Sequence, residues 1–300
     1  MPFTTRPGQP KPLGATVNAA GVNFSLFSEN ATKVALLLFN RSDDLQPAQV
    51  IEIDQPTQFY WHVQVDGLVA NAAYAYRVFG PSGDMDTQRF GYRFNGNKVL
   101  IDPYSHGNLD TLWVAANAED DSDNVATSMR SFVIDASNYD REGDTPPNVP
   151  MSDTVIYELH VRGYTRSGSS GVAHPGTFSG LIEKLPYIKS LGVTAIELMP
   201  VFDFDAKTPK RIGPVTGLPL VNFWGYDPIT FFAPQLHYCV SPDAATHVTE
   251  FRDLIKAAHR HGLEVILDVV FKSYRGGGPE WAGHRFQGNR QQGVLFSPNQ

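Results

Sequence analysis

Three carboxylates lie in or directly after apolar runs that we predict to be buried strands: Asp268, Glu158 and Glu197. A charged carboxylate in such a place is costly unless it is paired or hydrogen-bonded. Each of them therefore has either a structural ion-pair partner or a part in chemistry. A carboxylic acid held there could protonate a leaving group, and Glu197 is a candidate for this general-acid role. The residues alone leave both interpretations open.

Aromatic side chains could bind a ligand that presents an apolar face. Tyr226 lies in the short segment Trp224-Gly225-Tyr226-Asp227-Pro228. Taken alone, this tyrosine is better explained as a core or loop residue. Four more aromatic residues on two predicted strands are Tyr60, Trp61, Tyr74 and Tyr76. Strand alternation makes core packing at least as good an explanation for half of these four, so none is assigned to binding.

The remaining reactive residue types show no pattern of a metal or phosphate site. The nine histidines and the single Cys239 lack zinc-ligand spacing, and His259 and His261 cannot share a helix face. The glycines of 276–278 lack the preceding strand and the following Lys-Ser/Thr of a phosphate-binding loop. We predict no metal and no cofactor.

The carboxylates and Tyr226 fall in a part of the chain that alternates strand and helix. Strands are predicted over residues 154–161, 193–198 and 263–271, and helices over 178–191 and 249–261. Within the first helix, Pro186 demands a kink or a late start. Apolar strands of this kind belong to parallel sheets covered on both faces, so we predict the first three units of a (β/α)8 TIM barrel over residues 153–271. A whole barrel takes about 250 residues, so this one is incomplete.

The first third of the chain has a different pattern. Short runs at residues 21–28, 33–39, 59–65 and 74–78 are separated by turn residues. Most of them alternate apolar and polar side chains, which favours an all-β antiparallel sandwich over residues 10–105. A polar, proline-containing linker is predicted over residues 106–152.

Composition restricts the class of protein. The 300 residues carry a net charge of −7, which argues against binding to nucleic acid or to an anionic membrane. No stretch approaches the about 20 apolar residues of a membrane span, and no apolar run near Met1 suggests a signal peptide. With one cysteine, no disulfide can form within the chain. A cytoplasmic location is expected.

Several segments resemble isoamylase-type glycogen debranching enzymes of the α-amylase superfamily, glycoside hydrolase family 13. Their first barrel strand resembles Tyr157-Glu158-Leu159-His160-Val161-Arg162-Gly163-Tyr164-Thr165. The segment that carries their substrate-stacking tyrosine resembles residues 222–228 and 231–234, and a conserved superfamily motif opens like residues 268–271. Residues 74–81 and 93–104 resemble the sandwich module, carbohydrate-binding module family 48, that precedes such barrels.

The resemblance implies hydrolysis of α-1,6 branch linkages in glycogen or starch-like α-glucans by a retaining mechanism. It identifies Tyr226 as a platform for the sugar at the cleavage point and Asp268 as the acidic residue at the end of the third strand. It also implies a structural ion pair for Glu197. The retaining pair of carboxylates, about 5–5.5 Å apart, belongs to later strands. No residue of this chain is therefore assigned as nucleophile or general acid.

The sequence departs from the family pattern after Phe271. The family continues with Asn-His-Thr, whereas this chain has Lys272-Ser273-Tyr274-Arg275 and lacks the sugar-binding histidine. One inserted base in codons for Asn-His-Thr-Glu-Glu-Gly yields Lys-Ser-Tyr-Arg-Gly-Gly, the residues of 272–277. We therefore hypothesise a frameshift that makes residues 272–300 an out-of-frame segment, with real divergence as the alternative.

Three functional interpretations follow. The first is a debranching hydrolase in origin, truncated before its catalytic residues and inactive alone. The second is a non-catalytic glucan-binding module. The third is a branching or trehalose-releasing relative, which the segment around Glu158 and His160 disfavours. A second chain that supplies the missing strands would restore activity in the first case.

Overall fold

The computed structural model describes residues 2–82, 92, 94–118, 120–207, 211–243 and 246–270. They belong to two compact units, Met1–Asp135 and Ala136–Tyr274. The segment 272–300, for which we hypothesise a frameshift, lies outside the described residues. Among the residues that the structure describes, no helix is long and apolar enough to cross a lipid bilayer.

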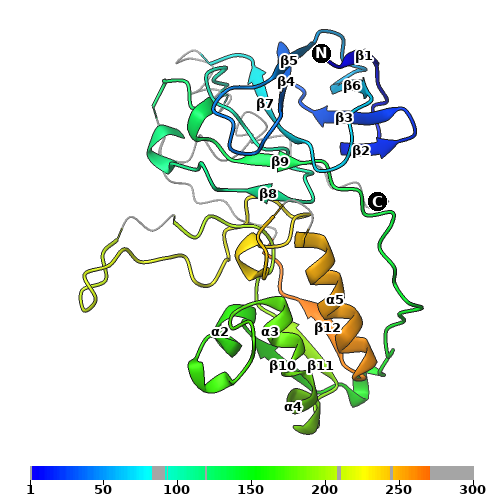
Figure 1. Ribbon diagram of the computed structural model, residues 1–300, viewed down its shortest axis with the longest axis vertical. Helices are drawn as coiled ribbons and strands as arrows, with labels where there is room; N and C mark the ends of the chain where they lie inside the picture. The colour runs from blue at the N-terminus through cyan, green and yellow to red at the C-terminus, as the bar shows by residue number, and fades with distance from the viewer. Residues whose placement is uncertain are drawn as a thin grey trace. The chain divides into compact units, whose positions relative to one another are not determined.

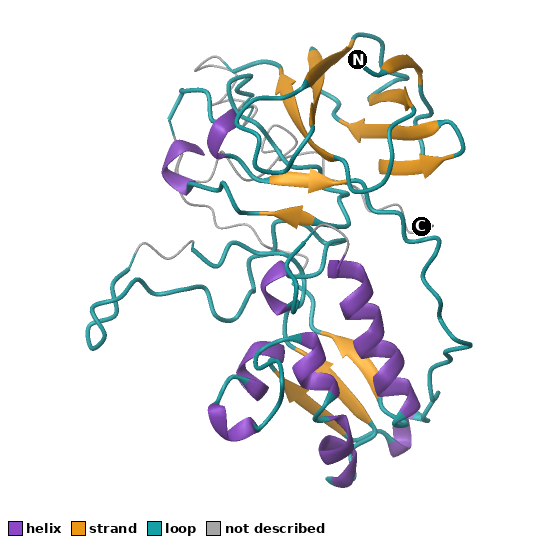
Figure 2. Cartoon of the chain, in the orientation of Figure 1, coloured by secondary structure: helices purple, strands orange, loops and turns teal. Residues whose placement is uncertain are grey.

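The first unit is a sandwich of two antiparallel sheets, as expected (Figures 1 and 2). One sheet has the strand order β1-β6-β3-β2 and the other has the order β5-β4-β7-β9-β8. The strands are β1 (Thr4–Pro7), β2 (Gly14–Asn18), β3 (Gly21–Phe27), β4 (Lys33–Phe39), β5 (Gln49–Ile53), β6 (Tyr60–Asp66), β7 (Ala73–Phe79), β8 (Asn108–Leu109) and β9 (Arg130–Phe132). Two short 3-10 helices, η1 (Ala115–Ala118) and η2 (Val125–Thr127), lie between β8 and β9.

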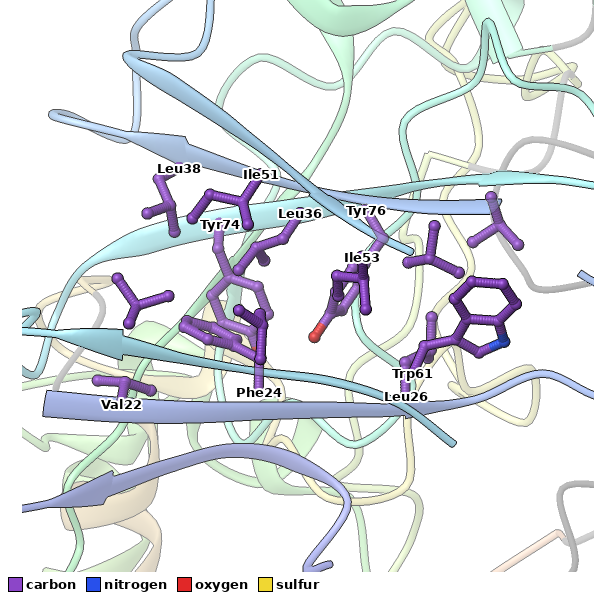
Figure 3. Close-up of a cluster of buried hydrophobic side chains, with 14 of the residues drawn as sticks. Val22, Phe24, Leu26, Leu36, Leu38, Ile51, Ile53, Trp61, Tyr74 and Tyr76 are labelled. Atoms are coloured by element: carbon purple, nitrogen blue, oxygen red, sulfur yellow. The ribbon is translucent and has the colours of Figure 1, made fainter. Parts of the chain in front are cut away.

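Alternating side chains of the two sheets fill the space between them (Figure 3). Trp61 is 5% exposed, and Tyr74 and Tyr76 are fully buried. Three of the four aromatic residues considered for a binding face are therefore core residues. Each large apolar side chain buried in this way stabilises the fold by about 1.5–3 kcal/mol. Tyr60 is half-buried and meets Phe27 edge to face, with ring centroids 5.3 Å apart.

The structure differs from the predicted linker in its first part, because β8 and β9 join the second sheet. Arg130 of β9 is buried, with its guanidinium 4.0 Å from the ring centroid of Phe39. It donates to the backbone carbonyls of Ser128 and Val125. Burial lowers the pKa of Arg130 to about 10. Hydrogen bonds make the burial of this arginine possible. The strand therefore contains no apolar run, and the sequence pattern did not indicate it.

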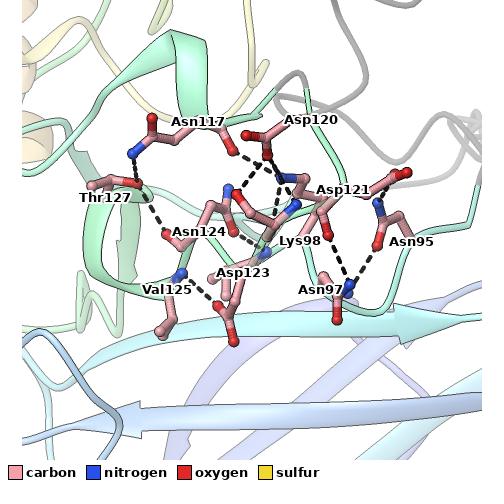
Figure 4. A network of polar contacts seen from close by, with 12 residues as sticks. Asn95, Asn97, Lys98, Asn117, Asp120, Asp121, Asp123, Asn124, Val125 and Thr127 are labelled. Carbon is pink, nitrogen blue, oxygen red and sulfur yellow. Dashed lines mark hydrogen bonds and ion pairs between the residues drawn. The ribbon is translucent and has the colours of Figure 1, made fainter.

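A second buried cation of this unit is enclosed by oxygen atoms (Figure 4). The Lys98 ammonium donates to the carbonyls of Asn117 and Ser122 at 2.8 and 2.6 Å, and to Asp120 Oδ1 at 3.0 Å. The three donors of an ammonium are thus all used. The amide group of Asn124 supports the same region by accepting from the Val99 N–H at 2.7 Å.

The second unit contains a parallel sheet of three strands in the order β10-β11-β12. The strands are β10 (Ile156–Leu159), β11 (Ala195–Leu198) and β12 (Glu264–Leu267). The helices are α2 (Val161–Thr165), α3 (Phe178–Ile182), α4 (Leu185–Ser190) and α5 (Thr246–Arg260), with the 3-10 turns η3 (Met151–Asp153), η4 (Gly168–Ser170) and η5 (Leu236–Tyr238). This is the start of the predicted barrel, with three strands among the described residues.

One face of this sheet is covered, and the opposite face is exposed along β10. Leu159, Ile196 and Leu198 pack into one buried cluster with residues of α3 and α5 (Figure 1). The opposite face carries Ile156, which is 46% exposed, and Glu158, which is also exposed. The predicted first helix is divided in two, because Pro186 stands in the first turn of α4.

Residues 136–149 run along α5 and are fixed to it by polar contacts. Tyr139 donates to Asp253 at 2.7 Å, and Lys256 forms an ion pair with Glu142 at 2.8 Å. His259 lies 2.9 Å from Asp144. We call residues 136–149 the α5 strap. It belongs to the barrel unit, although the sequence predicted a linker here.

Candidate functional site

The carboxyl ends of the three barrel strands lie in register. Glu158 is the backbone partner of Glu197, and Leu159 that of Leu198. The Asp268 N–H donates to the Leu198 carbonyl at 3.0 Å, so Asp268 directly follows the paired part of β12. His160 follows β10 at the same edge of the sheet. Active sites of such barrels lie at this edge.

The structure brings the two predicted site residues into direct contact. The hydroxyl of Tyr226 donates a hydrogen bond to Asp268 Oδ2, although the residues are 42 positions apart. Tyr226 remains 37% exposed. The hydrogen bond to Asp268, then burial and the nearby charges of Asp268, Glu158 and Glu197, raise the pKa of Tyr226 to about 12. The tyrosine is therefore a neutral donor near pH 7. Binding of a sugar by this pair remains a prediction.

A glycine is required beside Tyr226. Gly225 has φ +74°, a conformation that residues with a side chain rarely adopt. A Cβ atom at this position would lie 2.7 Å from the ring of Phe204. The close approach of Gly225 to this ring fixes the loop just before Tyr226.

Glu158 and Glu197 gather negative charge near this tyrosine. Within the described part of the chain, neither side chain makes a hydrogen bond or an ion pair. The ion pair that the resemblance implied for Glu197 is thus not made by these residues. Two like charges on directly opposed residues repel one another, so this face of the sheet favours a hydrogen-bond donor or a cationic group as its partner.

His160 has a position that the sequence analysis did not indicate. Its Nδ1 accepts from the Gly163 N–H at 2.9 Å and caps α2, while Nε2 lies 2.7 Å from the Phe223 carbonyl oxygen. The imidazole also stacks on the Phe223 ring, with centroids 4.2 Å apart. Burial lowers the pKa of His160, which favours the neutral ring. The only sequence signal was its place within the motif of the first predicted strand.

No group of three or more His, Cys, Asp or Glu residues suited to hold a metal ion occurs among the residues that the structure describes. The buried thiol of Cys239 has a pKa raised to about 12, first of all by burial. It is therefore a poor nucleophile near pH 7.

Comparison with known protein families divides the chain in the same order as the fold. Residues 12–105 match carbohydrate-binding module 48, the isoamylase N-terminal domain. Residues 121–275, just over half of the chain, match the catalytic domain of alpha amylase.

Curated relatives are similar over most of this chain. Isoamylase 1, chloroplastic, of Arabidopsis thaliana is 34% identical over 98% of this chain and 36% of its own length. A glycogen debranching enzyme of Klebsiella pneumoniae subsp. pneumoniae is 39% identical over 88% of this chain and 39% of its own length. The chain thus spans well under half the length of these two relatives.

Solved structures show the same fold. A mutant pullulanase from Paenibacillus barengoltzii complexed with maltotetraose has a TM-score of 0.67 and 25% identity, covering 87% of this chain and 38% of that one. The catalytic module of the pneumococcal protein SpuA has a TM-score of 0.66 at 23% identity, covering 86% of this chain and 37% of that one. By its catalytic-domain match and the isoamylase-type domain before it, this chain belongs to the α-amylase family, glycoside hydrolase family 13, among the isoamylases and glycogen debranching enzymes.

Proposed function

We propose that the chain binds α-glucans of the glycogen and starch class at the carboxyl ends of its barrel strands. The observation that carries the proposal is the hydrogen bond from Tyr226 to Asp268 at that edge. It orients a half-exposed aromatic ring whose face suits the C–H face of a pyranose. The relatives named as debranching enzymes and the pullulanase complexed with maltotetraose support the same class of ligand.

We propose further that the activity of origin is hydrolysis of α-1,6 branch linkages with retention. Such a reaction needs a nucleophilic carboxylate and a carboxylic acid that flank the scissile bond about 5–5.5 Å apart. Asp268 is engaged by Tyr226, and Glu158 and Glu197 are assigned no catalytic role. We therefore expect residues 1–300 alone to release no reducing ends from glycogen. Measurable debranching by the purified chain would contradict this expectation.

Binding is tested with maltotetraose and the full chain. Replacing Tyr226 by alanine removes the ring and is expected to weaken binding about tenfold, which corresponds to about 1.4 kcal/mol. Tyr187→Ala is the matched control, because Tyr187 is 57% exposed on α4, away from the strand ends. Isothermal titration calorimetry measures both. Equal affinities for wild type and Tyr226→Ala would refute the role of Tyr226.

A non-catalytic glucan-binding module is the second candidate, and the match of residues 12–105 to carbohydrate-binding module 48 favours it. In this case the sandwich would hold the glucan and the barrel strands would contribute nothing. Binding of glycogen that survives Tyr226→Ala, without hydrolysis, is the result that this candidate requires.

We also propose that further strands, supplied by another chain, can complete the barrel. Among the described strands, β10 and β12 form the two edges of the sheet, and Ile156 and Glu158 of β10 are exposed. Parallel strands at open edges leave backbone groups unpaired. Co-expression with the C-terminal part of the Klebsiella relative should then yield debranching activity. Its absence in a soluble mixture of both chains would argue against complementation.

The frameshift at codon 272 and the cytoplasmic location stay proposals. The catalytic-domain match ends at residue 275, in line with a change of frame. The alignment with the Arabidopsis relative covers 98% of the chain and so enters residues 272–300, which counts against it. Sequencing the gene decides: a one-base deletion near codon 272 must restore a recognisable fourth strand.

Fractionation of the source cells tests the cytoplasmic location, and the plant relatives are named as chloroplastic.

A further inference from the structure

The imidazole of His160 joins two segments through hydrogen bonds of opposite sense. Nδ1 accepts from the Gly163 N–H, so the proton of the neutral ring is on Nε2. Nε2 then donates to the Phe223 carbonyl at 2.7 Å. One ring thus caps α2 and at the same time holds a loop 63 residues further along the chain.

The ring contacts hold the side chain of Phe223 as well as its backbone. The His160 and Phe223 rings are nearly parallel, at 8°, with centroids 4.2 Å apart. Phe223 is 40% exposed, so part of its ring faces solvent. Trp224 meets Phe223 edge to face, with centroids 5.2 Å apart. The His160 ring is itself held on another side by Tyr238, whose hydroxyl lies 3.2 Å from Nε2.

Contacts on both sides of Tyr226 restrict the movement of the loop that begins at Phe223. Gly225 lies against the ring of Phe204. Beyond Tyr226, the Ile229 N–H donates to the Asp203 carbonyl at 2.8 Å. A displacement of Phe223 would therefore be passed to Tyr226, whose hydroxyl must reach Asp268.

We propose that His160 is a positioning residue for Tyr226. It acts through Phe223 and sets where the tyrosine ring lies at the strand ends. This inference rests on the proposed glucan binding for its functional consequence, whereas the positioning itself can be measured without a ligand.

Two conservative variants separate the two hydrogen bonds. In His160→Asn, the amide oxygen replaces Nδ1 as the cap of α2, but the side chain is too short to reach Phe223. In His160→Gln, the amide nitrogen can replace Nε2 as the donor to Phe223, at the expense of the cap. We expect His160→Asn to weaken maltotetraose binding about fivefold to tenfold, and His160→Gln to recover part of the loss. If His160 only caps α2, His160→Asn will bind maltotetraose more tightly than His160→Gln, and the proposal is overturned.

The indole N–H signal of Trp224 gives a test that needs no glucan. In ¹H–¹⁵N spectra of the full chain, Trp224→Phe identifies this signal. The His160 and Trp224 rings have centroids 6.2 Å apart, so loss of the imidazole alone changes this signal, and His160→Gln, which also lacks the ring, is the reference. We expect the signal in His160→Asn to differ from that in His160→Gln by more than its line width, and the signals of the buried Trp61 and Trp113 to stay unchanged. Identical Trp224 signals in folded His160→Asn and His160→Gln chains overturn positioning. Failure of the wild-type chain to bind maltotetraose, with the Trp224 shift present, would instead refute the proposed function and leave positioning supported.

Discussion

Lys98 of the sandwich and Glu158 of the barrel unit are both charged residues, but their surroundings differ. The Lys98 ammonium is buried, and three oxygen atoms at 2.6–3.0 Å use all its donors. Glu158 is exposed, faces Glu197 on the next strand and has no hydrogen bond or ion pair within the described residues. The first arrangement is closed and suits stability. In the second, the carboxylate oxygens of Glu158 have no donor among the described residues, which suits a place where a ligand or a further strand would bind.

The largest effect that would test this comparison is expected from Lys98→Met. The variant removes the buried ammonium and leaves the part-buried carbonyls of Asn117 and Ser122 without this donor, which should lower the free energy of unfolding by about 2–3 kcal/mol. Lys33→Met is the matched control, because Lys33 is 39% exposed and forms a surface ion pair with Glu52. It should cost less than about 1 kcal/mol. Urea unfolding measures both. Similar losses for the two variants would mean that the enclosed ammonium stabilises no more than a surface one.

A smaller effect concerns Asp102, the buried carboxylate of the sandwich. Burial raises its pKa to about 6, although the Tyr104 N–H and the Tyr74 hydroxyl donate to it. Between about pH 4 and pH 6 the folded state therefore holds a proton that the unfolded chain releases. The contribution of Asp102 to stability is present below this window and is lost as the pH rises through it, by at most about 2–3 kcal/mol.

Asp102→Asn should remove this pH dependence, since an amide does not titrate. Thermal unfolding of the full chain between pH 4 and pH 7 measures the slope. Asp54→Asn, at an exposed position, is the control and should leave the slope unchanged. An unchanged slope in Asp102→Asn would show that Asp102 is already ionised throughout this range.

The smallest effect is expected at the carboxylates of Glu158 and Glu197 near Tyr226. Glu158→Gln removes one of the negative charges that raise the pKa of Tyr226, after the hydrogen bond to Asp268 and burial. We expect the pKa of Tyr226 to fall, measured by ¹³C NMR of labelled tyrosine. Glu183→Gln is the control, because Glu183 is an exposed residue at the end of α3, on the covered side of the sheet. No difference between the variants would mean that water fully screens Glu158 from the tyrosine.

Much of the architecture could be predicted from apolar periodicity. The strands that were not predicted, β1 and β9, share a cause. The apolar run of residues 33–39 coincides with β4, and the predicted helix over 249–261 overlaps α5. β1 has only exposed residues, and β9 buries Arg130 and Ser131, so neither shows the alternation of a half-buried strand. Their pairing depends on partners far along the chain.

The candidate site was readable only where a family motif marked it. Tyr226 and Asp268 were predicted from such motifs, and the structure places them in contact. His160 lay inside a quoted motif without a role, because its partner Phe223 is 63 positions away. A single histidine within a predicted strand has no periodicity that could indicate such a contact.

The α5 strap decides where recombination between relatives could exchange the two domains. A crossover near residue 150 would separate Tyr139, Glu142 and Asp144 from the helix to which they are bound. In such a recombinant, Lys256 and His259 of α5 would face strap residues that come from the other parent. A crossover near residue 135 would transfer the strap together with its helix. For domain shuffling, natural or in the laboratory, the inherited barrel module thus begins well before its first strand.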